Sequence, residues 1–199
     1  MIFAVVGPSG AGKDTLIVGA MAARPDLRLA RRVITRPSDA GAEDFEGVTD
    51  AEFGARMARG DFALHWQAHG LSYGIPASQF AGAGDVLFNG SRAALPAALA
   101  SFPDLRVILV TAPDAVLASR LAARGRETPA IVRDRLSRAA LRLPQGVAVT
   151  TVLNDTTPEV GIARLLAALR SDAALSHTFD AAVPMASPPD RKPDTGSER

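Results

Sequence analysis

The clearest chemical pattern in the chain is a glycine-rich loop that ends on a lysine, Gly7-Pro8-Ser9-Gly10-Ala11-Gly12-Lys13. An apolar run over 2–6, typical of a strand buried on both faces, precedes it, and a helical stretch over about 14–23 follows. Glycines let backbone N–H groups turn inward around phosphate oxygens, and the helix N-terminus adds partial positive charge. The pattern predicts a phosphate-binding loop in which Lys13 reaches the β- and γ-phosphates of a nucleotide. The alternative is a turn that only joins strand to helix.

The residue after the lysine departs from the general motif, which has serine or threonine there as a Mg²⁺ ligand. This chain has Asp14, followed by Thr15. A carboxylate is a hard oxygen ligand that suits Mg²⁺, either directly or through water. We therefore predict Asp14 as a metal ligand and Thr15 as a contact to an α-phosphate. The alternative for Asp14 is an acidic helix start, which is favourable against the helix dipole.

The elements that must position this loop follow from the apolar pattern. Strands are predicted over 2–6, 31–36, 62–68, 86–89, 106–111 and 147–153. Helices are predicted over about 14–23, over 49–59, where Thr49 and Glu52 form a capping box, and from Pro113, Pro129 and Pro158. Because helices separate the strands, parallel pairing is favoured, and the predicted fold class is an α/β sandwich.

Composition narrows the chemistry further. The chain has no cysteine, which excludes disulfides, thiolate catalysis and iron–sulfur clusters. A net charge of +1 gives no general attraction to nucleic acid. The chain carries 22 lysines and arginines, of which only Lys13 and Lys192 are lysines. Lys13 is thus the only lysine inside the predicted folded part.

Length and hydropathy give the expected organisation. The 199 residues fit one domain, since domains commonly have ~100–200 residues. Residues 171–199 are rich in Pro, Asp, Ser and Ala without a hydrophobic period, so we predict a domain over 1–170 and a disordered tail. No apolar run reaches the ~18 residues of a membrane span, and the N-terminus lacks a basic region and cleavage site. We expect a cytoplasmic protein without a membrane partner.

Over about residues 1–170 the chain resembles guanylate kinases. The shared segments are GPSGAGKD (7–14), ITR (34–36), YG (73–74), RLAARGRET (120–128) and LND (153–155). The resemblance implies a three-layer P-loop fold with a parallel core sheet. It also implies an acceptor-binding region over about 31–80 and an arginine-rich lid over about 120–138.

Four positions depart from the guanylate kinase pattern. Leu64 stands where those enzymes carry the glutamate that reads guanine, and Gly90 falls near their second guanine-reading carboxylate. Asp39 and Phe45 replace a phosphate-binding arginine and tyrosine. A base-reading pocket owes its selectivity to polar groups that would otherwise stay unpaired, so losing those groups argues against guanine.

The chain is more similar to the ribose 1,5-bisphosphate phosphokinase family, in which aspartate after the lysine is normal. Its motifs occur in order as GKD (12–14), RVITR (32–36), LHWQAHGLSYG (64–74), NGSRAALP (89–96) and RGRE (124–127) followed by IVRDRLSRA (131–139). The resemblance implies transfer of the γ-phosphoryl group of ATP, with Mg²⁺, to the 1-phosphate of ribose 1,5-bisphosphate. The products are 5-phosphoribosyl 1-pyrophosphate and ADP, in phosphonate catabolism.

The resemblance also implies roles for individual residues. Catalytic cations are Lys13, Arg36, Arg124 and Arg126. Nucleotide contacts are residues 7–13 with Asp14, Thr15, Arg120 and Asn154, and Asp14 holds the metal. Phosphosugar contacts are Arg32, Arg36, Tyr73, Asn89, Ser91, Arg92 and Arg135. The acceptor phosphate is already largely a dianion near pH 7, because its second pKa is ~6, so no general base is needed.

Several alternatives stay open on the sequence. One is a nucleoside monophosphate kinase with another base preference, and another is a non-catalytic binding module, which the intact loop opposes. Ser91 can equally cap the next helix, and arginines can be solvated helix faces. His65 and His69 stand four residues apart, but in a strand and turn they do not predict a metal site. A homodimer is neither predicted nor excluded.

Overall fold

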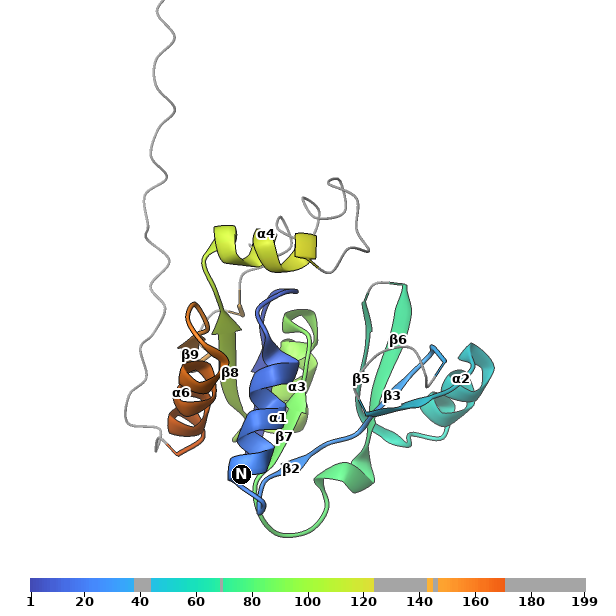
Figure 1. Ribbon diagram of the computed structural model, residues 1–199. Helices are drawn as coiled ribbons and strands as arrows, with labels where there is room; N and C mark the ends of the chain where they lie inside the picture. The colour runs from blue at the N-terminus through green and yellow to red at the C-terminus, as the bar shows by residue number, and fades with distance from the viewer. Residues whose placement is uncertain (38–43, 69, 124–142, 145–146, 171–199) are drawn as a thin grey trace, which may run out of the picture.

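The computed structural model of the protein describes residues 1–37, 44–68, 70–123, 143–144 and 147–170. Its core is a five-stranded sheet in the order β2-β7-β1-β8-β9 (Figure 1). The strands are β1 (Ile2–Val6), β2 (Arg28–Leu29), β7 (Val86–Asn89), β8 (Arg106–Thr111) and β9 (Val149–Leu153). Every neighbouring pair is parallel, which confirms the predicted pairing for this sheet.

Both faces of the core sheet are buried. Successive side chains of a strand point to opposite faces, and β1 shows this directly. Phe3 and Val5 belong to the core shared with α1 (Lys13–Ala23) and α6 (Pro158–Arg170). Ala4 and Val6 belong to the core shared with α3 (Leu95–Ser101). The arrangement is the three-layer sandwich that the sequence predicts, and continuous apolar strands are its signature.

A second sheet stands beside the first and carries the motifs that are predicted to bind the acceptor (Figure 1). Its order is β4 (Phe45–Gly47), β3 (Arg32–Ile34), β6 (Leu71–Pro76), β5 (Phe62–Ala68), with α2 (Asp50–Ala58) beside it. β5 pairs with β6 and β6 with β3 in antiparallel fashion, so the general expectation of parallel pairing is wrong here. The reason is the short connection between β5 and β6, which suits a hairpin and no crossover.

The other predicted elements are present wherever the structure describes their residues. The capping box is present, because Thr49 Oγ1 accepts from Glu52 N at 3.2 Å and Glu52 Oε2 accepts from Thr49 N at 2.8 Å. The helix predicted from Pro113 is α4 (Asp114–Ala123), and the one predicted from Pro158 is α6. Two short 3₁₀ segments, Ala77–Phe80 and Arg92–Ala94, complete the described elements. The helix predicted from Pro129 and the tail over 171–199 lie outside the described residues.

No helix in the described part of the chain combines the length and the apolar character that a membrane span requires.

Candidate active site

The phosphate-binding loop lies where β1 ends and α1 begins, at the carboxyl edge of the parallel sheet. Ligands of open α/β sheets bind at this edge. Gly12 caps α1 in a left-handed conformation, with φ 86°, which glycine adopts without steric cost. Lys13 Nζ donates to the carbonyl oxygens of Gly7 at 3.0 Å and Pro8 at 3.1 Å. The ammonium group is therefore held across the loop, at the place where nucleotide phosphates bind in such motifs.

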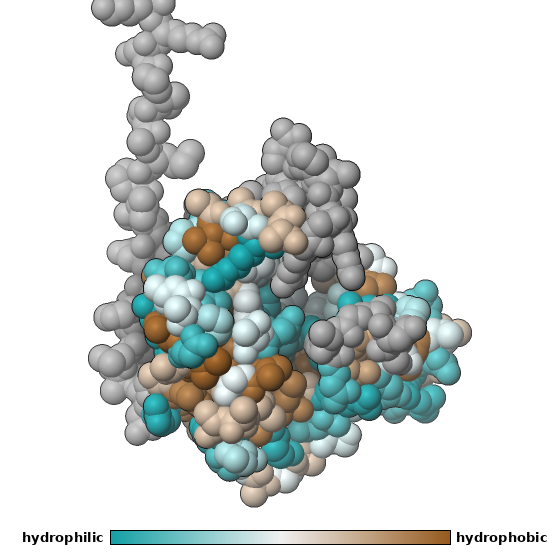
Figure 2. Space-filling model, viewed as in Figure 1, coloured by the Kyte–Doolittle hydropathy of each residue, from teal (hydrophilic) through white to brown (hydrophobic). Residues whose placement is uncertain are grey.

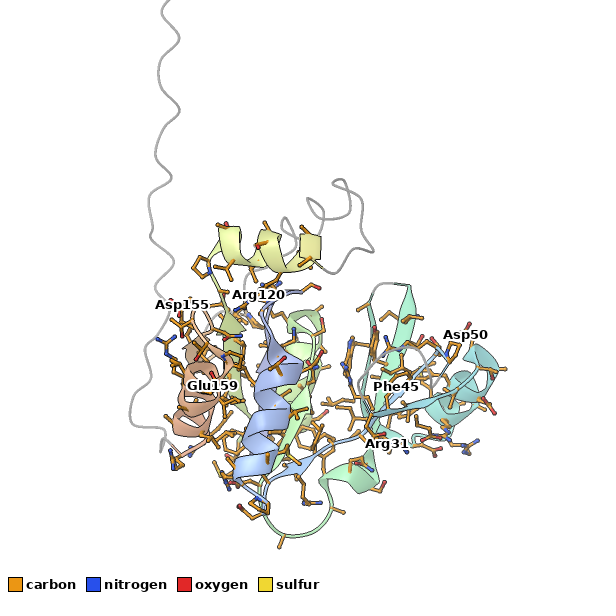
Figure 3. The ribbon with its side chains drawn as sticks, in the orientation of Figure 1. Arg31, Phe45, Asp50, Arg120, Asp155 and Glu159 are labelled. Carbon is orange, nitrogen blue, oxygen red and sulfur yellow. The ribbon has the colours of Figure 1, made fainter. Side chains whose placement is uncertain are left out.

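Arg120 reaches the same loop from α4. Figure 3 shows it below α4, beside the loop that leads into α1. A Cβ atom placed on Gly12 would lie 3.9 Å from Arg120 Nη1. This Nη1 is buried and finds no hydrogen-bond partner within the described residues. A buried cationic donor without a partner is costly, and a phosphate oxygen at the loop would satisfy it.

Asn154 lies beneath the loop, and 5% of its surface is exposed. Its Nδ2 donates to the carbonyl oxygen of Ala11 at 2.8 Å, so the amide holds the loop backbone. Two glycines make room for it, since a Cβ on Gly12 would lie 2.5 Å from Nδ2 and one on Gly161 would lie 2.7 Å from Oδ1. A direct contact of Asn154 with nucleotide stays a prediction, while support of the loop is visible in the structure.

Replacing Asn154 with alanine tests this support. Asn154→Ala leaves the Ala11 carbonyl without its partner, which costs about 1–3 kcal/mol of unfolding free energy. Because the loop loses its fixed geometry, we expect the Kd of the non-hydrolysable ATP analogue AMPPNP to rise by about tenfold, equivalent to about 1.4 kcal/mol. Denaturant unfolding and calorimetric titration measure the two effects. Thr156→Ala, at an exposed site just beyond, is the control, and equal affinities in both variants would contradict the role.

Asp14 opens α1 with an exposed carboxylate, and Asn89 contacts it from the end of β7. Asn89 Nδ2 donates to Asp14 Oδ1 at 2.7 Å. Within the described residues no group of three or more His, Asp or Glu side chains forms a metal cage. The single carboxylate of Asp14 fits Mg²⁺ as it binds in phosphoryl-transfer sites, where one or two carboxylates, waters and substrate phosphates are its ligands.

Arg32 faces this junction from the second sheet. Its Nη1 donates to the main-chain carbonyl oxygen of Asn89 at 3.0 Å. The guanidinium carbon lies 5.5 Å from the ring centroid of Tyr73, within the range of a cation–π contact. Tyr73 in turn stacks on Trp66, with ring centroids 5.4 Å apart and an angle of 4° between the planes. Arg32 and Tyr73, both predicted acceptor contacts, are thus brought together.

Arg36 follows β3 and lies over the ring of Phe45, 4.2 Å from its centroid. Its Nε is buried and has no hydrogen-bond partner among the described residues. Phe45 thus forms a platform beneath the guanidinium, a role that the sequence comparison with guanylate kinases did not show. Like Arg120, Arg36 holds a donor that an anionic ligand would satisfy.

Ser91 and Arg92 follow Asn89 at the same edge of the core sheet. Ser91 Oγ accepts from Ala93 N at 3.3 Å and so caps the short 3₁₀ segment, the alternative role raised by the sequence. Burial lowers the pKa of the Arg92 guanidinium from its ordinary value, through desolvation of the charge. Sugar binding by Ser91 and phosphate binding by Arg92 stay predictions.

Of the other predicted positions, some are described by the structure and some lie outside the described residues. Leu64, aligned with the guanine-reading glutamate of guanylate kinases, is 3% exposed in the core that contains Trp66 and Ile75. Thr15 is exposed in the first turn of α1, and its phosphate contact stays a prediction. Four positions lie outside the described residues, namely Asp39, Arg124, Arg126 and Arg135.

The chain is similar in sequence to curated bacterial kinases. No protein-family model matches the chain. A bifunctional ribose 1,5-bisphosphokinase-thymidine phosphorylase of Azorhizobium caulinodans is 48% identical over 180 residues, which make up 87% of this chain and 26% of that protein. The chain therefore spans about a quarter of the length of that bifunctional relative.

A second relative and a solved structure complete the comparison. A guanylate kinase of Anaplasma phagocytophilum superposes with a TM-score of 0.57 at 16% identity, over 85% of this chain and 84% of that one, and confirms the predicted fold class. A ribose 1,5-bisphosphate phosphokinase of Ruegeria sp. (strain TM1040) is 55% identical over 149 residues, 73% of this chain and 78% of that protein. The chain therefore belongs to the ribose 1,5-bisphosphate phosphokinase family.

Proposed function

We propose that this chain transfers the γ-phosphoryl group of ATP to the 1-phosphate of ribose 1,5-bisphosphate, forming 5-phosphoribosyl 1-pyrophosphate and ADP. The supporting observation is that Asn89 bonds both to Asp14, directly after the phosphate loop, and to Arg32 of the second sheet, beside Tyr73. Family membership supports the choice of acceptor, because the Ruegeria relative is named for this substrate.

On the donor side the loop supplies backbone N–H groups and the Lys13 ammonium to the phosphates of ATP. Arg120 adds a second cation, whose Nη1 has no hydrogen-bond partner among the described residues. Phosphoryl transfer passes through a loose, metaphosphate-like transition state, so catalysis depends on positioning and charge neutralisation. Asp14, with phosphate oxygens and water, would hold Mg²⁺, and the ion would supply neutralisation of phosphate charge.

On the acceptor side the arginines match the two phosphates of the sugar. A guanidinium presents donors in a fixed fork that suits phosphate oxygens, and Arg36 has a buried donor available for one. The pKa of the second ionisation of a phosphate monoester is ~6, so the nucleophilic oxygen needs no general base near pH 7. This removes the need for a histidine or carboxylate beside the acceptor.

The burial of Leu64 supports a sugar phosphate over a nucleotide as acceptor. The resemblance to guanylate kinases aligns Leu64 with the glutamate that reads guanine in those enzymes. Here the side chain is packed into the core, so it offers no hydrogen bond to a base edge. A base would gain no polar recognition from this residue.

The direct test measures ADP release by the full chain with Mg-ATP and either ribose 1,5-bisphosphate or GMP. We expect kcat/KM with the bisphosphate to exceed that with GMP by at least about 10³-fold, because Leu64 offers no hydrogen bond to the base. Phosphorus NMR of the product should show a pyrophosphate at carbon 1 of the sugar. Turnover of GMP alone would favour the nucleoside monophosphate kinase, and silence with both acceptors would reject the proposal.

A further inference from the structure

Asn89 contacts both halves of the site through two different groups. Its side-chain Nδ2 donates to Asp14 Oδ1 at 2.7 Å, on the nucleotide side. Its main-chain carbonyl oxygen accepts from Arg32 Nη1 at 3.0 Å, on the acceptor side. Asn89 thus bonds to one group on each side of the site. The phosphoryl donor and the phosphoryl acceptor must approach each other between these two groups.

The position of Asn89 is fixed by the core sheet. The residue is 8% exposed and pairs with Val5 of β1, the strand that leads into the phosphate loop. Directly after it, Gly90 N donates to the carbonyl oxygen of Val5 at 3.0 Å. The backbone is also closely packed here, because a Cβ on Gly90 would lie 2.9 Å from the Phe88 ring. Both contacts of Asn89 therefore start from one defined place, the end of β7.

We propose that Asn89 is a positioning residue for phosphoryl transfer. Its amide orients the Asp14 carboxylate, and its carbonyl oxygen holds Arg32, so the end of β7 aligns the nucleotide with the acceptor. The inference rests on the proposed function and gives Asn89 a role through its bonds to Asp14 and Arg32, beyond its predicted contact with the sugar. In-line transfer requires the reacting atoms within about 3–3.5 Å, so small losses of alignment lower the rate strongly.

The same contacts give the protein a built-in reporter. Arg32 lies over Tyr73, and Tyr73 stacks on Trp66, which is 9% exposed and is the single tryptophan of the chain. We expect nucleotide binding to turn the Asp14 carboxylate together with the Asn89 amide bonded to it, and this change to alter the Arg32 contact with the Tyr73–Trp66 pair. Tryptophan emission should then report on the acceptor side when only the nucleotide site is filled.

Asn89→Leu tests the inference, because leucine retains the volume of the buried side chain and removes the donor. We expect kcat to fall by about 100-fold while the KM of the acceptor and the Kd of AMPPNP change by less than about threefold. We also expect Mg-AMPPNP to change Trp66 emission in the wild-type protein and to leave it unchanged in the variant. Calorimetric titration in the same samples shows that the nucleotide is bound.

Ser101→Leu is the control. Ser101 is exposed at the last residue of α3, outside the Asp14–Asn89–Arg32 contacts, so its variant should keep the wild-type kcat and emission response. Asn89→Ala replaces Asn89→Leu if leucine prevents folding. A variant at position 89 with wild-type kcat or a wild-type emission response overturns the proposal, as does a wild-type protein whose emission ignores AMPPNP. The emission experiment needs no acceptor, so it remains decisive even if ribose 1,5-bisphosphate is not turned over.

Discussion

Lys13→Ala should lower kcat by about 10³-fold or more, the largest loss expected from a single side chain of this site. The ammonium bonds to the Gly7 and Pro8 carbonyl oxygens at 3.0 and 3.1 Å, so it is already located at the phosphate loop. The transition state spreads negative charge over the transferring phosphoryl oxygens. In the alanine variant the Lys13 ammonium group is missing and does not neutralise that charge. Steady-state ADP release with ribose 1,5-bisphosphate measures the loss.

The chain offers a matched control for this variant. Lys192 is its only other lysine, so Lys192→Ala removes the same charge by the same substitution far along the sequence. We expect this control to retain wild-type kcat, and circular dichroism should show both variants folded. A Lys13→Ala protein that keeps more than a tenth of the wild-type kcat would refute the assignment of the loop.

The phosphate loop was predictable because its signal is local. The glycines, the lysine, the apolar strand before them and the helix after them all lie within the first 23 residues. The capping box of α2 is local in the same sense, since Thr49 and Glu52 are three residues apart. Patterns of this kind need no knowledge of which strand lies beside which.

The contacts of Asn89 and Asn154 could not be derived this way. Asn89 meets a carboxylate 75 residues earlier in the chain, because β7 lies next to β1 in the sheet. Asn154 meets Ala11 across 143 residues, because β9 and α6 bring it beneath the loop. The sequence predicts both amides as ligand contacts. The structure shows that both side chains bond to other parts of the protein, and these partners become neighbours only through the order of the strands in the sheet.

The antiparallel part of the second sheet was missed for a related reason. The β6 sequence, LSYGIP, contains a glycine and ends on a proline, which are both unfavourable for strands. The strand is stabilised by packing instead, since a Cβ on Gly74 would lie 2.6 Å from the Phe62 ring of β5. Because residue 74 is a glycine, the Phe62 ring can cover the backbone there. Strand propensities of single residues cannot predict this packing between two strands.

Gly7→Ala is the second variant from which we expect a large effect, and here the cause is steric. A Cβ on Gly7 would lie 2.0 Å from the Val110 carbonyl oxygen, and Gly7 has φ 153°. β8 is hydrogen-bonded on both sides, to β1 and to β9, so Val110 has little freedom to move away. The loop must shift instead, and with it the two carbonyl oxygens that hold Lys13.

We expect Gly7→Ala to lower the unfolding free energy by about 3 kcal/mol, the upper end of overpacking costs, and to raise the Kd of AMPPNP at least 100-fold. Denaturant unfolding and calorimetric titration measure both. The control is Gly54→Ala in α2, where a new Cβ meets no atom within 4 Å. Because alanine is the better helix former, this control should gain about 0.5–1 kcal/mol and keep its nucleotide affinity. A Gly7→Ala protein that binds AMPPNP as tightly as Gly54→Ala would show that the contact between Gly7 and β8 does not set the shape of the loop.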